Sequence, residues 1–365
     1  MTDPDGSRPS SEATRLSRRY VTLVAASLSV IVLTCVAWMV PVPYVKMSPG
    51  PVFDTLGDFN GEQMLVIGSD VETFPTSGTL DFTTVAVTSV SGEVSLVEAI
   101  RAYFDDDVAV VPRSLVYPEG FTAEQSQEQG AAQLTSSKDS SRVAALRAAG
   151  YEVPEVPVIG TVVDDGASEG ILEPSDEVLG VGGVPVDSPD EVVAAVARTS
   201  PGDTISLRIR REGVESDVQI VTQPDAEDPD LPRIGVTLGS AFEFPVDIVN
   251  QVGDSIGGPS AGTMFALAIY DMLTPGELTG GARVAGTGEI TPDGEVRPIG
   301  GIRQKMAGAG ADDVDVFLVP DANCDEADRG TDYGMTLVRV TTLDDAIESL
   351  EALAEDPDAE VPSCS

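Results

Sequence analysis

The stretch Gly257-Gly258-Pro259-Ser260-Ala261-Gly262 places a serine inside a glycine-flanked turn. Immediately after it, Ala261 to Leu273 is almost continuously apolar and predicts a buried helix, so Ser260 should lie at a helix N-terminus. Unpaired backbone N–H groups at that end of a helix suit a developing oxyanion. The turn therefore has the features of a nucleophile site as well as those of a helix cap.

A nucleophilic serine needs a base to take its proton. The chain contains no histidine, which excludes a Ser-His-Asp arrangement. Lysine is the natural substitute, and the chain has only three, Lys46, Lys138 and Lys305. Lys305 lies 45 residues after Ser260. Read singly, the serine is a helix cap and the lysine a solvated charge; read together, they predict a hydrolase that uses both.

Two other serine patterns do not fit. Gly258-Pro259-Ser260-Ala261-Gly262 matches the G-x-S-x-G elbow of α/β-hydrolases, but that fold needs a downstream histidine. The S-x-x-K pattern of β-lactamases is absent, because Thr135-Ser136-Ser137-Lys138 begins with threonine.

Composition excludes several classes of partner. The chain of 365 residues has 61 acidic and 21 basic residues, a formal net charge of −40, which repels nucleic-acid phosphates. No phosphate-binding G-x-x-x-x-G-K-S/T loop occurs, so we expect no ATP hydrolysis by this chain. With no histidine and only three cysteines, we expect no metal and no cofactor.

Val21 to Val40 runs for 20 residues without a charge. At about 1.5 Å per residue, this length matches a hydrocarbon core of about 30 Å. Three arginines precede it, so we expect residues 1–20 to be a cytoplasmic tail, 21–40 a transmembrane helix of the cell membrane, and the rest extracytoplasmic. A cleaved signal peptide is an alternative, although Trp38-Met39-Val40-Pro41 is a poor cleavage site, and lipid modification of Cys35 is another.

An oxidising compartment permits a disulfide between Cys324 and Cys364. It would join the acidic tail, residues 355–365, to the last domain. Two free thiols are the alternative, because sequence does not give the distance between the two Cα atoms.

The extracytoplasmic region 41–150 is expected to begin with strands, at Met64 to Ile67 and Gly78 to Val87. A helix should follow from Ser95 to Phe104, with Ser95 as its N-cap and Glu98 completing a capping box. Residues 120–150 are expected to be polar helical segments that end near Gly150.

Residues 151–224 are expected to be a compact unit of strands and one helix, with strands at Val156 to Val163 and Thr204 to Arg211. Gly166 to Val186 resembles the bacterial PDZ pattern, with Ser175 where that family commonly has glycine. The resemblance implies capture of peptide C-termini as an added strand, with a peptide-binding loop before residue 160. A packing module without an open groove is the alternative.

Residues 225–354 open with a charged linker, Asp225 to Asp230, and continue as an α/β domain with a strand at Phe244 to Val249. Besides the serine turn, Gly288-Glu289-Ile290 and Pro298-Ile299-Gly300-Gly301-Ile302-Arg303-Gln304-Lys305 resemble the Lon-type serine–lysine peptidase domain. The strand and helix of 77–104 resemble the start of the same domain. The PDZ-like unit would then be inserted into one peptidase fold, or packed between its two parts.

The resemblance implies that Ser260 is the nucleophile and Lys305 the base, made neutral by burial in an apolar pocket. It implies that Thr287 orients the amine. The supporting turn residues are Gly258, Pro259 and Ala261. Lon enzymes often carry an acidic residue where this chain has Gly257, and Asp254 is the candidate for that orienting role.

The sequence therefore predicts an α+β protein with an N-terminal transmembrane helix, a PDZ-like module and a Lon-type proteolytic domain of mixed α/β layers. It resembles a bacterial family of membrane-anchored, ATPase-less Lon-like proteases. That resemblance implies an ATP-independent endopeptidase for extracytoplasmic proteins or peptides, with the PDZ-like module for substrate recognition. It also implies a hexameric ring. The alternative is a non-catalytic PDZ adaptor or scaffold at the membrane.

Overall fold

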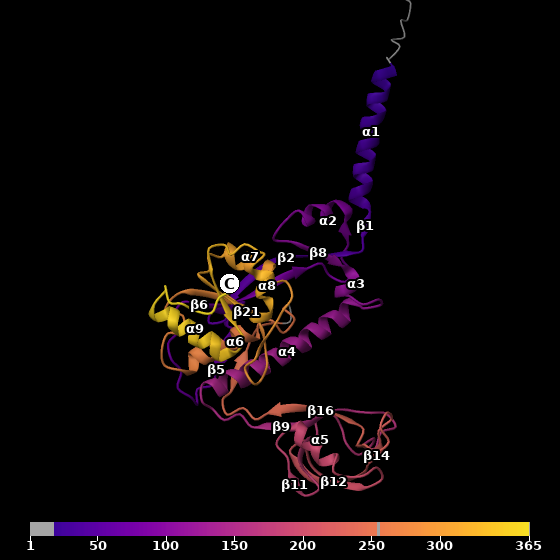
Figure 1. Cartoon of the computed structure of the whole chain (residues 1–365), viewed down its shortest axis with the longest axis vertical. Coiled ribbons are helices and arrows are strands. Elements are labelled where there is room, and N and C mark those ends of the chain that lie inside the picture. The colour runs from indigo at the N-terminus through magenta and orange to yellow at the C-terminus, as the bar shows by residue number, and fades with distance from the viewer. Residues whose placement is uncertain (1–17, 254–255, 365) are drawn as a thin grey trace, which may run out of the picture.

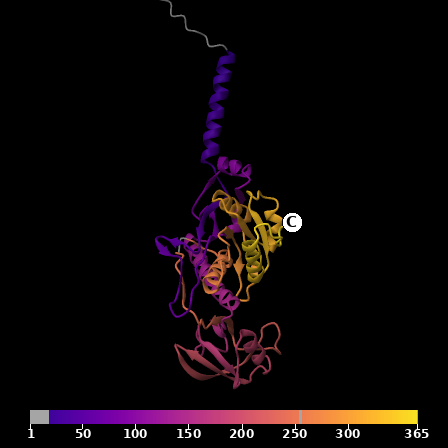
Figure 2. The ribbon, with the colours of Figure 1, turned by 90° about the vertical axis from the view of Figure 1, so that its left-hand side faces the viewer.

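The computed structural model describes residues 18–253 and 256–364. They form a long helix, a central body and a small module, arranged in line (Figures 1 and 2). The long helix, α1 (Arg18–Met39), has no buried residue. Among the described residues it is the one helix long and apolar enough to cross a membrane, by length and composition. A helix over the predicted apolar segment is therefore confirmed, whereas its membrane insertion stays a prediction.

The body is built on a six-stranded sheet in the order β22-β21-β18-β6-β2-β8. Strands β6, β18, β21 and β22 run parallel, whereas β2 pairs antiparallel with β6 and β8. The two ends of the chain thus contribute to one sheet. The strands are β2 (Tyr44–Asp54), β6 (Thr79–Val87), β8 (Ala109–Pro112), β18 (Arg283–Gly286), β21 (Val316–Pro320) and β22 (Thr336–Val340).

Helices cover both faces of this sheet. Alternate residues of a strand point to opposite faces, and both faces here carry apolar side chains. In β21, Leu318 packs into one hydrophobic cluster with helices α4, α6 and α9. Its neighbours Phe317 and Val319 pack into a second cluster with α7 and α8. These helices are α4 (Ala123–Ala148), α6 (Gly262–Leu273), α7 (Ile302–Ala311), α8 (Cys324–Ala327) and α9 (Leu343–Glu355).

Several helix boundaries follow from local chemistry. Helix α2 (Leu96–Tyr103) has Ser95 as its N-cap, and Glu98 completes the capping box, as predicted. Helix α4 runs for 26 residues over the predicted helical region and also begins with a capping box. The predicted apolar helix after Ser260 is α6, which is buried along most of its length.

The small module (residues 155–242) has its own sheet, in the order β13-β12-β10-β9-β16, and its own hydrophobic cluster. One face is buried as predicted, since Ile205, Leu207 and Ile209 lie inside. Its elements are β9 (Glu155–Val162), β10 (Glu177–Val181), β11 (Val184–Pro185), α5 (Pro189–Val196), β12 (Thr204–Arg211), β13 (Val214–Val221) and β16 (Val236–Phe242).

Three expectations about this region need correction. The module does not end at residue 224, because β16 pairs with β9 over its whole length. The segment expected to be a linker instead connects β14 (Gln223–Pro224) to β15 (Pro232–Arg233), which pair with each other. The strand expected at Phe244 to Val249 is also shorter: β17 (Ile248–Asn250) pairs with β5 (Leu65–Ile67), and Pro245 has no N–H to donate to a ladder.

A disulfide joins Cys324 to Cys364, with the two Cα atoms 5.1 Å apart. Next to it, Ser363 forms an isolated bridge with Val338 of β22, so the C-terminal segment lies against the edge of the main sheet. The remaining short elements are β1 (Pro41–Val42), β3 (Asp58–Phe59), β4 (Glu62–Gln63), β7 (Val94–Ser95), α3 (Arg113–Val116), β19 (Glu289–Ile290), β20 (Val296–Arg297) and η1 (Asp321–Asn323).

Candidate active site

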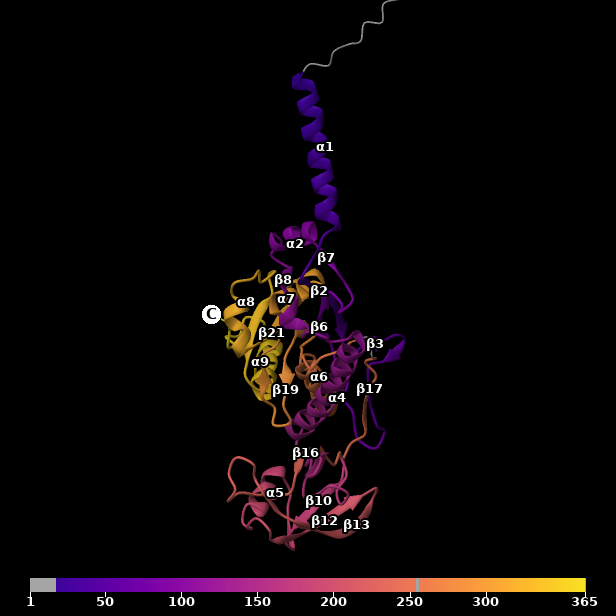
Figure 3. The same ribbon diagram turned by 90° about the vertical axis from the view of Figure 1, so that its right-hand side faces the viewer.

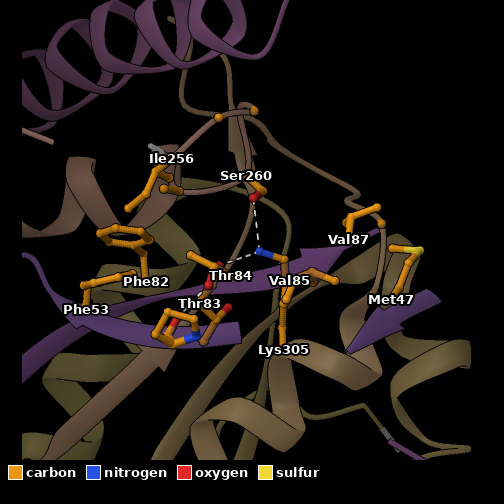
Figure 4. Close-up of a pocket in the computed structure, with 16 residues that line it drawn as sticks. Met47, Phe53, Phe82, Thr83, Thr84, Val85, Val87, Ile256, Ser260 and Lys305 are labelled. Carbon is orange, nitrogen blue, oxygen red and sulfur yellow. Dashed lines mark hydrogen bonds between the residues drawn. The ribbon is translucent and has the colours of Figure 1, made fainter. Parts of the chain in front are cut away.

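Ser260 and Lys305 lie side by side although they come from helices on opposite faces of the sheet. Lys305 Nζ is 3.1 Å from Ser260 Oγ and 2.6 Å from the carbonyl oxygen of Thr83 (Figure 4). Strand β18 pairs with β6 only as far as Phe82, whereas β6 continues to Val87. The serine turn and the lysine therefore meet beside β6, just beyond the last pair that it forms with β18.

The amine of Lys305 is buried, with 3% of the residue exposed. Ile302 and Met306 on the same helix are buried beside it. Because burial disfavours the ammonium form, it lowers the pKa of Lys305 to about 7. At neutral pH a large share of the molecules thus has an uncharged amine next to the serine hydroxyl.

Helix α4 holds the serine turn from the other side. The N–H of Gly258 donates to the carbonyl of Gly130 at 3.0 Å, and Ser137 Oγ donates to the carbonyl of Pro259 at 2.9 Å. The same helix also contacts the segment before the serine turn, where Lys138 Nζ donates to the carbonyl of Val252. Gly258 has φ +95°, a conformation that only glycine adopts without strain. The turn is therefore fixed mainly by its backbone.

The sequence predicted helical segments over residues 120–150 but not their contact with the serine turn. The hydrogen bond from Ser137 to Pro259 joins residues more than a hundred positions apart, so no local pattern indicates it. Gly130 in the middle of a helix was an available signal, since glycine there usually costs stability and needs a packing reason. The two backbones pack closely here: a Cβ on Gly257 would lie 3.2 Å from Gly130 Cα, whereas a Cβ on Gly130 would make an ordinary contact with Gly257 Cα at 3.5 Å.

Thr287 contacts Ser260 in a way that differs from the expectation. Its hydroxyl donates to the backbone carbonyl of Ser260 at 3.0 Å, and the N–H of Gly288 donates to the same carbonyl at 2.8 Å. Among the described residues, the second hydrogen-bond partner of the Lys305 amine is the Thr83 carbonyl. No sequence pattern marks a backbone acceptor of this kind.

Of the remaining predicted residues, Ala261 is buried and is the N-cap of α6. Asp254 lies outside the described residues. Within the part of the chain that the structure describes, the backbone N–H groups of Ser260 and Ala261 have no hydrogen-bond acceptor. The same part contains no group of three or more metal-ligating side chains.

Ser260 and Lys305 line a cavity of about 510 Å³. Figure 4 shows Phe53, Phe82 and Ile256 on one side of the two polar side chains, and Met47 and Val87 on the other. The cavity walls are mainly apolar, and residues 83–87 of β6 form one of them.

A second cavity, of about 650 Å³, lies in the small module between α5 and β16. Val192, Val193 and Val196 line it from the helix, and Val236 and Leu238 line it from the strand. β16 is the last strand of its sheet, so its outer edge has no strand partner among the described residues. Val163 also lines this cavity. The position expected for the peptide-binding loop, before residue 160, stays a prediction.

Comparisons with known proteins give two domain matches. Residues 254–352 match the C-terminal proteolytic domain of Lon protease (S16), and residues 132–222 match the PDZ domain. Lon protease 2 of Herpetosiphon aurantiacus is 36% identical over 121 residues, which are 32% of this chain and 14% of that protein. Lon protease of Phenylobacterium zucineum is 30% identical over 169 residues, which are 44% of this chain and 20% of that protein.

The chain thus spans only a small part of the curated relatives that it matches. Among solved structures, the PDZ domain of the SdrC-like protein Lmo2051 from Listeria monocytogenes is 22% identical, with a TM-score of 0.21, and covers 22% of this chain and 85% of that one. From the two domain matches, we conclude that this chain carries a PDZ domain and the C-terminal proteolytic domain of Lon protease.

Proposed function

We propose that this chain is a membrane-anchored, ATP-independent endopeptidase in which Ser260 and Lys305 form the catalytic dyad. The observation that carries the proposal is the 3.1 Å contact between Lys305 Nζ and Ser260 Oγ inside an apolar cavity. A neutral amine can accept the hydroxyl proton, and the lowered pKa of Lys305 makes the neutral form available at physiological pH.

The reaction would follow the usual course of acyl transfer. Ser260 Oγ attacks the peptide carbonyl while its proton passes to Lys305 Nζ, and the resulting ammonium donates a proton to the leaving amine. Water then attacks the carbonyl of the acyl-enzyme and gives a proton to Lys305 Nζ, which passes it to Ser260 Oγ as the product acid leaves. The Thr83 carbonyl accepts a hydrogen bond from the amine and keeps it directed at the serine. The N–H groups of Ser260 and Ala261 are the candidate donors to the oxyanion.

An extended substrate fits the open edge of β6. Residues 83–87 line the cavity, and among the described residues they have no strand partner on the β18 side, because β18 ends at Gly286. A peptide could pair there as an added strand and pass its scissile carbonyl over Ser260. The apolar side formed by Phe53 and Phe82 would then receive a neighbouring side chain.

The PDZ domain would select substrates. The free edge of β16 and the apolar face of α5 enclose a cavity of the shape in which an extended peptide adds to a sheet. With α1 crossing the membrane and the arginines on the cytoplasmic side, both domains would lie outside the cell. Assembly into a hexameric ring stays a prediction from the family resemblance.

The test compares Ser260→Ala and Lys305→Ala with Lys46→Ala in cleavage of an unstructured protein without ATP. Each dyad variant should lose activity by about 10³-fold or more, whereas Lys46→Ala, which removes another lysine, should retain it. Full activity in either dyad variant contradicts the mechanism. The alternative, a non-catalytic PDZ adaptor, predicts peptide binding without turnover in the unsubstituted chain as well.

A further inference from the structure

Helix α2 has apolar side chains on the face that points away from the body. Leu96, Ile100, Tyr103 and Phe104 follow the spacing of one helix face and are called here the outer face of α2. Tyr103 and Phe104 are 78% and 80% exposed, whereas Ala102 on the inner side is buried. The helix therefore buries one face against the body and presents two aromatic rings to its surroundings.

This helix is tied to the end of α1. The N–H of Leu96 donates to the carbonyl of Val40 at 3.1 Å, one residue beyond the end of α1. The next residues pair as strands, with Pro41 opposite Ser95 and Val42 opposite Val94. Figures 1 and 3 show α2 lying across the base of α1, at the end of the body nearest to it. Wherever the end of α1 lies, α2 must lie beside it.

We propose that the outer face of α2 inserts into the boundary between the headgroups and the acyl chains of the bilayer that α1 crosses. The proposal rests on the membrane anchor of the proposed function. A 22-residue apolar helix with no buried residue needs lipid around it, and the surface that continues directly from its end meets the same lipid. Tyrosine and phenylalanine on an amphipathic helix suit this position, where one side of the helix is apolar and the other is wet.

The chain returns to the body after α2. The backbone carbonyls of Asp106 and Asp107 accept hydrogen bonds from Arg303 and Gln304 of α7, which draws the segment back onto the body. Trp38, in the last turn of α1, is half exposed and marks the expected depth of the membrane interface.

Insertion of α2 would fix the orientation of the body as well as its distance from the membrane. Met47, which lines the cavity beside Ser260, follows Val40 by seven residues. At about 3.3 Å per residue, the two lie at most about 23 Å apart. With α1 as the sole attachment, the body could tilt about the single connection at residue 40. With α2 as a second attachment, the cavity stays near the membrane surface, within reach of extended segments of other membrane proteins.

The test uses tryptophan fluorescence in vesicles of phosphatidylcholine and phosphatidylglycerol with brominated acyl chains, which quench indoles that enter the lipid. The chain has a single tryptophan, Trp38, so the unsubstituted protein reports on the anchor alone. The double variant Trp38→Phe/Phe104→Trp reports on the outer face of α2. The matched control is Trp38→Phe/Val214→Trp, because Val214 is 69% exposed on the distant small module. Cleavage of a soluble peptide, expected to be unchanged, verifies that each variant folds.

We expect brominated lipid to quench Trp38 and the indole at position 104, and to leave the indole at position 214 unaffected. Quenching of Trp38 together with an unquenched indole at position 104 would overturn the proposal and leave the anchor intact. A blue-shifted but unquenched indole at position 104 would also overturn it, since a second protein copy would then cover the face. An unquenched Trp38 would overturn both the anchor and the proposal.

Discussion

The buried amine of Lys305 should set the pH dependence of catalysis. A lysine with a pKa of 10.5 is neutral at pH 7 in about one molecule in 3,000, whereas a pKa of about 7 leaves about half of the molecules neutral. We therefore expect kcat/KM to rise about tenfold per pH unit below pH 7 and to level off above it. The assay is initial-rate cleavage of a fluorogenic peptide between pH 5 and pH 9, with Lys46→Ala as the control for loss of a lysine.

The same burial should appear in stability. The folded pKa of Lys305 lies below its unfolded value, so the unfolded state binds more protons between pH 7 and about 10.5, and the free energy of unfolding rises with pH across that window. The cost of burial is fully present below pH 7, where it reaches up to about 5 kcal/mol. Lys305→Met should consequently raise Tm at pH 6 and raise it less at pH 9. A kcat/KM midpoint near 10, or a Lys305→Met variant that is destabilised at pH 6, would refute the reasoning.

Three further predictions concern the supports of the site. Gly257→Asp should lower kcat/KM by roughly 10- to 100-fold, because its Cβ would lie 3.2 Å from Gly130 Cα and displace the serine turn; unchanged peptide cleavage would contradict this. Ser137→Ala removes the donor to the Pro259 carbonyl, so the free energy of unfolding measured with denaturant should fall by about 1–3 kcal/mol. The same substitution should lower kcat more than it raises KM. Cys364→Ser removes the disulfide, which closes a loop with a sequence separation of 40, so it should lower the free energy of unfolding by about 4 kcal/mol. An equal Tm with and without the substitution under oxidising conditions would argue against the bridge.

Local patterns predicted the elements that depend on neighbouring residues. The capping box at Ser95 located α2, and the continuous apolar run after Ser260 located α6. The alternation of apolar residues in Thr204 to Arg211 identified the buried face of β12. Each of these patterns spans about a dozen residues or fewer, and the tertiary packing agrees with the element that each pattern favours.

Features that depend on distant backbone contacts could not be predicted. The membership of β16 in the small module rests on hydrogen bonds to β9, across a segment whose charge and proline resembled a linker. The Thr83 carbonyl that accepts a hydrogen bond from the Lys305 amine is a backbone group, so the residue type does not indicate it. The support that α4 gives to the serine turn likewise arises from packing across more than a hundred residues.

Labelling by a serine-directed fluorophosphonate, followed by mass spectrometry of the peptide that contains Ser260, tests the proposed dyad most directly. The account predicts covalent modification at Ser260 in the unsubstituted chain, at a rate that rises with pH through about 7 and falls sharply in Lys305→Ala. Modification at another residue, or a labelling rate at Ser260 that is the same with and without the lysine, would contradict it.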